Sequence, residues 1–272
     1  GDYYNGTFSC RAGVGIFHLA GGVFDMGGHS LQLGEWSGEN GYSNGLAVIT
    51  IENDAQAVVN NEIRLANRNA SPEAYVNLNG GVLTASYFQK GGNNTAGNAA
   101  SAAIAFNGGV LRVTDQGNTA SSLVRTGSNN SPAQLNVYAG GAVIETPGAN
   151  GGTLLDQPLR APSGLGVASV TVTAPGTGYI APPAVLFAGG NGSGATAIAE
   201  IDTATGTLTA IRVTSSGTGY TSAPSVTLRG GGGTAAAASA TVGTSASGGL
   251  TKLGAGLLNL AAASTYTGPT VV

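Results

Sequence analysis

The sequence predicts an all-β protein: a parallel β-helix, or solenoid, with a small two-copy β module inserted in it. Glycine accounts for 47 of the 272 residues and charged residues for only 8%, a composition that suits short strands joined by tight turns. Gly-Gly pairs flanked by alternating apolar residues recur along the amino-terminal half. A second, unrelated repeat with an offset of 41 residues follows them.

The Gly-Gly repeat defines the coils of the predicted solenoid. Its units begin at Val23, Val76, Ile104 and Leu135, and the gaps between successive glycine pairs are 53, 28 and 32 residues. The first gap is close to two periods, so residues 46–65 are expected to supply the coil in between. A period near 28 residues with internal period-two alternation is typical of a solenoid. The pairs expected to form structural turns are Gly27 and Gly28, Gly80 and Gly81, Gly108 and Gly109, and Gly140 and Gly141.

Each coil is expected to contain about three short strands. Val76, Ile104 and Leu135 should then stack in register inside the tube, because they occupy equivalent places before the glycine pairs. A Gly-Gly step allows a sharp corner, since neither residue carries a Cβ atom.

The second repeat starts at Val167 and again at Leu208. Gly178-Tyr179 recurs as Gly219-Tyr220, 41 residues later, and Pro183 recurs as Pro224. Each copy alternates strand-like segments with glycine-rich turns, and the tyrosines are expected to pack over glycine corners. The two copies are therefore predicted to pair as one small all-β module.

Two Pro/Gly-rich joints, 158–166 and 243–249, bracket this module. The predicted organisation is β-helix coils over 1–161, the two-copy module over 162–246, and a further β-helix coil over 247–272 that continues beyond the chain end.

The last segment also resembles a known family. It shares the pattern of the autotransporter-associated β-strand repeat at thirteen positions, with Ala262 and Pro269 as departures: Gly248, Gly249, Leu250, Thr251, Lys252, Gly254, Gly256, Leu258, Leu260, Tyr266, Thr267, Gly268 and Thr270. The resemblance covers about a tenth of the chain. It implies a right-handed parallel β-helix in a secreted or surface-displayed bacterial protein, such as the passenger of an autotransporter. It implies an architecture and a destination, and no reaction.

Charge and hydropathy exclude several classes of function. The net charge is −3 and only two lysines are present, so no basic stripe exists to bind nucleic acid. No apolar run reaches the ~18 residues of a membrane helix. The single cysteine, Cys10, is expected to be a small apolar filler, with a link to another chain as the alternative.

The candidate chemical groups are few. His18, Asp25 and His29 fit no familiar zinc spacing, and no metal or cofactor is expected. Glu35, Trp36 and Glu39 combine two carboxylates with an aromatic ring, which is the chemistry of a sugar contact. A solvated loop is the favoured interpretation of these three residues, and carbohydrate contact is the alternative.

The sequence therefore favours a structural, non-enzymatic protein, extracellular or at the bacterial cell surface, that serves as a rigid stalk, fibre or adhesin segment. Its expected partner is a host or matrix surface, or a second copy stacked end to end, because the terminal strands carry almost no charge. One alternative is a carbohydrate-binding or carbohydrate-active β-helix. A second alternative is a self-assembling filament subunit.

Overall fold

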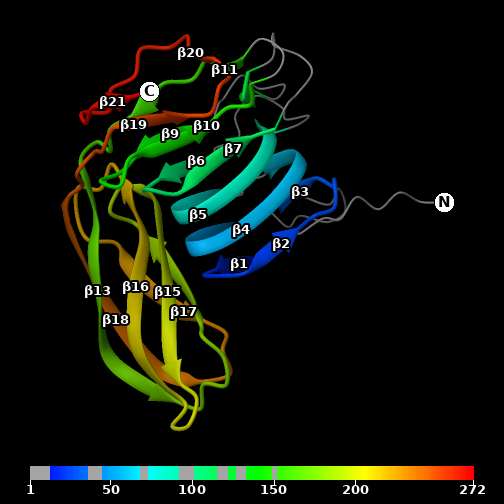
Figure 1. Ribbon diagram of the computed structural model, residues 1–272. Coiled ribbons are helices and arrows are strands. Elements are labelled where there is room, and N and C mark those ends of the chain that lie inside the picture. Colours follow the sequence, from blue (N-terminus) through cyan, green and yellow to red (C-terminus); the bar gives the residue numbers. More distant parts are fainter. Residues whose placement is uncertain are drawn as a thin grey trace. The chain divides into compact units, whose positions relative to one another are not determined.

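The computed structural model describes residues 13–35, 45–67, 73–91, 101–114, 122–126, 133–148 and 152–272. Twenty-one strands and no helix are found among these residues. The chain forms two compact units (Figure 1): one contains residues 1–161 together with 247–272, and the other contains residues 162–246.

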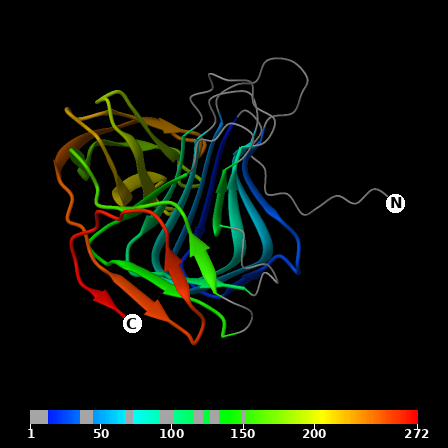
Figure 2. The same ribbon diagram turned by 90° about the horizontal axis from the view of Figure 1, so that it is seen from above.

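The first unit is a parallel β-solenoid of about four turns. Two long strands, β4 (Leu46–Asn67) and β5 (Glu73–Lys90), each follow the coil around its corners, and they lie side by side (Figure 2). Shorter strands complete the coils that follow: β6 (Ser101–Phe106), β7 (Val110–Val113), β8 (Val124–Thr126), β9 (Gln134–Val137), β10 (Ala142–Glu145) and β11 (Thr153–Leu155). The strands at the two edges are β1 (Val14–Leu19), β2 (Val23–Asp25) and β3 (Leu31–Glu35) on one side, and β12 (Leu159–Arg160), β19 (Leu250–Leu253), β20 (Leu258–Leu260) and β21 (Thr270–Val271) on the other.

Parallel pairing arranges these strands in three faces. The first face runs from β1 through the starts of β4 and β5 to β6, β9 and β12. The second face runs from β2 through the middle of β4 and β5 to β7, β10, β19 and β21. The third face runs from β3 through the ends of β4 and β5 to β8, β11 and β20.

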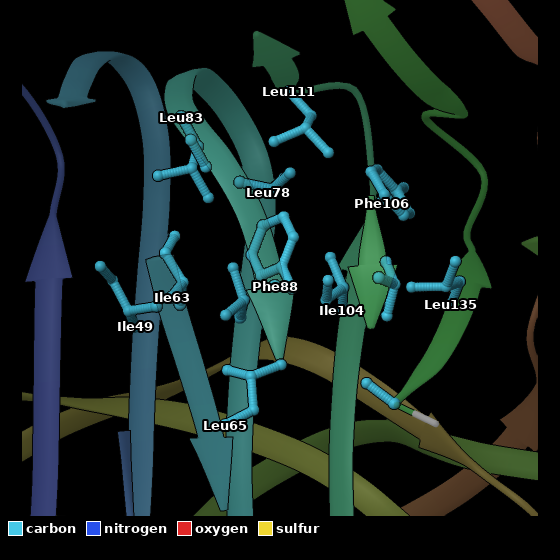
Figure 3. Close-up of a cluster of buried hydrophobic side chains, with 14 of the residues drawn as sticks. Ile49, Ile63, Leu65, Leu78, Leu83, Phe88, Ile104, Phe106, Leu111 and Leu135 are labelled. Carbon is cyan, nitrogen blue, oxygen red and sulfur yellow. The ribbon is translucent and has the colours of Figure 1, made fainter. Parts of the chain in front are cut away.

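An aliphatic ladder fills the interior behind the first face. Ile49 pairs with Val76, Val76 with Ile104, Ile104 with Leu135 and Leu135 with Leu159, and each of the five side chains is at most 1% exposed. Figure 3 shows Ile49, Ile104 and Leu135 of this row. It also shows Leu78, Phe88 and Phe106, which belong to the same core. The predicted parallel solenoid is confirmed, with Val76, Ile104 and Leu135 stacked inward on successive coils.

Glycines line the corner between the first and second faces, and they are needed for two different reasons. Gly108 and Gly141 adopt φ angles of 93° and 80°, which favour glycine. Gly109 and Gly140 have no such φ, but a Cβ on either would lie 2.5 Å from backbone atoms of the preceding coil. Successive coils therefore touch backbone to backbone at this corner.

Gly27 and Gly28 form a turn of a different kind. They connect β2 to β3, at the next corner of the solenoid, and a Cβ on either would meet nothing within 4 Å. Their φ angles of 58° and 86° explain the choice of glycine. In this coil the first-to-second corner is occupied by Gly21 and Gly22 instead, so the Gly-Gly unit at Val23 is shifted in register from the others.

The second unit is a six-stranded antiparallel sheet. Its strand order is β17-β14-β15-β16-β13-β18, and the two strands that end this order contact each other, so the sheet curls back on itself. The strands are β13 (Leu165–Thr177), β14 (Ala184–Ala188), β15 (Ser193–Asp202), β16 (Thr207–Thr218), β17 (Ser225–Arg229) and β18 (Thr234–Thr244).

The chain leaves and re-enters the solenoid in register. Leu159 and Arg160 pair with Leu135 and Asn136, and the chain returns where Leu250 pairs with Ala142. Residues 162–246 are therefore inserted in the sequence between a first-face strand and a second-face strand. In the preceding coil this connection is the short turn from Tyr138 to Gly141.

Candidate functional site

Polar side chains gather on the outer side of the third face. Ile63, Leu65 and Phe88 point into the core, and side chains alternate along a strand. Glu62 and Tyr87, which are in register, therefore point outward from β4 and β5. A second outward row joins Gln32, Arg64, Gln89 and Arg125, which pair from β3 through β8.

Some contacts within this cluster join neighbouring coils, and others lie within one coil. The Arg125 guanidinium carbon lies 3.6 Å from the centre of the Tyr87 ring, a cation–π contact. Arg125 Nε also donates to the carbonyl of Ser122 at 3.3 Å. The Ser122 hydroxyl in turn donates to Asp156 Oδ1 at 2.5 Å. Glu62 Oε2 and Arg64 Nε are 2.8 Å apart.

Two acceptor oxygens of the cluster have no hydrogen-bond partner. They are Oε1 of Gln32 and Oε1 of Glu62, on residues that are 8% and 4% exposed. A buried acceptor without a donor is unfavourable, and both oxygens are closed to solvent. Tyr87, Arg64 and Arg125 are half-buried, and an aromatic ring with two guanidinium groups is a set of groups suited to holding a polyhydroxylated ligand.

Only part of the predicted sugar contact falls within the described residues. Glu35 is the last residue of β3, in register with Asn67 on the same third face. Trp36 and Glu39 lie outside the described residues, as does Cys10. Contact of Glu35, Trp36 and Glu39 with carbohydrate therefore stays a prediction.

Sequence reasoning missed Gln32, Glu62, Tyr87 and Arg125. Glu62 and Tyr87 are 25 residues apart, whereas Gln89 and Arg125 are 36 apart, because the turns between the faces differ in length. A search at one fixed period cannot align these residues, although the alternation within each strand does mark them as outward-facing.

The histidines and Asp25 have separate local partners. His18 Nε2 lies 2.6 Å from Glu52 Oε1, joining β1 to β4 on the first face. Asp25 Oδ1 accepts a hydrogen bond from the amide of Gly27 and stabilises that turn. The amide of His29 donates to the carbonyl of Met26. Among the described residues no group of three His, Cys, Asp or Glu side chains could hold a metal ion.

Two ionisable groups at opposite ends of β5 have shifted pKa values. Burial raises the pKa of Glu73, against a smaller lowering by the Tyr75 hydroxyl, which donates to Glu73 Oε2 at 3.2 Å. Burial lowers the pKa of Lys90. Both shifts come mainly from desolvation of the charged form, as expected at the rim of a packed coil.

Comparison with protein-family models, with curated proteins and with solved structures finds no match for this chain. Within the described ranges, no helix is long and apolar enough to cross a membrane.

Proposed function

We propose that this chain is a rigid segment of a structural protein outside the bacterial cell, serving as a stalk, a fibre or part of an adhesin. The observation that carries the proposal is the unbroken ladder from Ile49 to Leu159. Because each coil hydrogen-bonds to the next and buries aliphatic side chains against it, bending the tube would break many contacts at once.

The geometry of residues 248–271 supports the proposed kinship with autotransporter-associated repeats. Gly254, Gly256 and Gly268 are motif positions at which a Cβ would lie closer than 3.0 Å to backbone of an adjacent coil segment. Leu258, Leu260 and Tyr266, also motif positions, pack against the core. The motif residues are thus the ones a stacked coil requires, which is the architecture that the family resemblance implies.

The test is the location of the native protein. An antibody raised against residues 162–246 should label intact producing cells or be captured from the culture medium. External protease should remove the signal from intact cells. Recovery of the protein only inside cells, protected from protease until lysis, would contradict the proposal.

The second candidate function is carbohydrate binding, which the outward cluster of Glu62, Tyr87 and Arg125 favours. Glycan-array binding followed by calorimetry would test it. Replacing Tyr87 by Ala should remove any binding found, whereas Gln56→Ala, an exposed change on the second face, should leave it intact. Equal binding by both variants would show that the cluster is not the site.

A further inference from the structure

The 41-residue copies in the second unit exchange their contacts reciprocally. We define copy one as residues 165–205 and copy two as 206–246. Copy one contributes β13, β14 and β15, and copy two contributes β16, β17 and β18. Thr177 pairs with Thr234, and Ser193 pairs with Thr218. Adding 41 residues to Thr177 and Ser193 gives Thr218 and Thr234, so each pair becomes the other when the copies are interchanged.

Two pairs lie on the axis of this symmetry. Val170 pairs with Ile211, and Leu186 pairs with Thr227. The members of each pair are separated by 41 residues, so each residue faces its own equivalent. Such self-facing pairs are the mark of an isologous, two-fold interface.

The tyrosines obey the same exchange. Tyr179 of copy one covers Gly233 of copy two, and Tyr220 of copy two covers Gly192 of copy one. At both glycines a Cβ would approach the ring closer than 3.0 Å. The amide of Ile180 donates to Gly231, and the equivalent amide of Thr221 donates to Gly190, both at 2.9 Å.

A single copy keeps almost none of this pairing. The one strand pair within a copy is β14 with β15, registered at Ala184 and Ile198. The pairings of β13 with β18, β15 with β16, β14 with β17 and β13 with β16 all join the two copies. Because an isolated hairpin is marginal in water, each copy depends on the other for its fold.

We propose that each copy is a self-complementary pairing element, and that two chains of this protein join by exchanging copies. Copy one of each chain then pairs with copy two of the other chain. The inter-copy contacts are retained in the joined form, while the turn over residues 203–206 opens. Leu165 and Thr244 of one chain, which pair with each other in the single chain, then pair with their counterparts in the other chain.

That turn decides between the two forms. The Gly206 amide donates to the Asp202 carbonyl at 2.8 Å, and the Ala204 amide donates to Asp202 Oδ1 at 2.8 Å. A tight turn holds the copies at a high effective concentration within one chain. Exchange between chains is therefore favoured where chains are crowded, or where the turn cannot form.

Shortening the turn gives the direct test. Deleting all four turn residues, 203–206, from the full chain leaves Asp202 and Thr207 as the connection. Without a glycine these two residues disfavour the tight hairpin turns, so β15 and β16 should not pair within one chain. The expected product has twice the mass of the 26.4 kDa chain, with residues 162–246 as resistant to protease as in the parent. A control with four Gly and Ser residues inserted at the same place should stay monomeric. A monomeric deletion variant with a protease-sensitive second unit would overturn the proposal.

A second test keeps the turn intact. One chain carries Leu186→Cys and the other carries Thr227→Cys, both with Cys10→Ser, and the two are unfolded and refolded together before oxidation. A disulfide between the chains should form in a yield that rises with concentration, because positions 186 and 227 meet only across copies. Arg229→Cys in place of Thr227→Cys is the matched control, since Arg229 is in register with Ala184. Equal cross-linking in both experiments, or none in either at any concentration, would refute exchange.

Discussion

The backbone contact between coils makes a sharp prediction for Gly109. An added methyl group would lie 2.5 Å from the Gly80 carbonyl oxygen and 3.0 Å from the Gly80 nitrogen. Both atoms belong to backbone, so no side-chain rotamer can relieve the clash. The corner must open, which strains the hydrogen bond from the Gly109 amide to the Leu78 carbonyl at 3.1 Å.

The expected loss in the free energy of unfolding is the sum of three contributions. Overpacking costs about 3 kcal/mol at the upper end of its range, and a weakened hydrogen bond adds about 1 kcal/mol. The reduced freedom of the unfolded chain offsets about 0.5–1 kcal/mol. Gly109→Ala should therefore destabilise the solenoid by about 3 kcal/mol, which corresponds to a fall of roughly 6–12 °C in Tm for a unit of this size.

Thermal unfolding followed by far-ultraviolet circular dichroism measures this effect, with Gly21→Ala as the matched control. Gly21 lies at the same corner of an earlier coil, but its nearest neighbour is the mobile end of the Asp54 side chain at 3.3 Å. The control should change stability by no more than about 0.5 kcal/mol. If both variants melt at the same temperature, close approach between coils is not the reason for glycine at this corner.

Four further predictions use other features. Ile104→Ala should lower the free energy of unfolding by about 2–5 kcal/mol, measured by urea titration, because it leaves a cavity in the ladder. Glu73→Gln should raise stability at neutral pH and have no effect in acid: burial raises the folded pKa of Glu73, so its ionisation opposes folding as pH rises. Asp202→Asn should remove a contribution that is present above the unfolded Asp pKa and is lost as pH falls, since amide hydrogen bonds lower the folded pKa; urea titrations across acidic pH would show it. Common polysaccharides should stay uncleaved in reducing-end assays, and cleavage abolished by Glu35→Gln or Glu39→Gln would contradict a structural role.

The ladder was predictable from sequence because two separate patterns mark its residues. Val76, Ile104 and Leu135 each precede a glycine pair, and each lies in an alternating run whose register decides which face is buried. The corner between the first and second faces repeats at nearly constant spacing, so a single period captures it.

Other features escaped prediction for physical reasons. Gly27 and Gly28 satisfy a positive φ rather than a close approach, and a sequence pattern does not separate these two uses of glycine. The outward cluster of Glu62, Tyr87 and Arg125 depends on turn lengths that vary from coil to coil. Its members become neighbours only when the pairing of the strands is known.

The in-register return of the chain at Leu250 has a consequence for how such proteins can diversify. The ladder needs correct pairing at Leu159 and at Leu250, and it places no limit on how many residues intervene. A unit inserted here needs its two ends close together. The second unit meets this requirement, because its first and last strands pair at Leu165 and Thr244. This connection is therefore a suitable insertion site. One folded unit can replace another there without a change in the sequence of the solenoid.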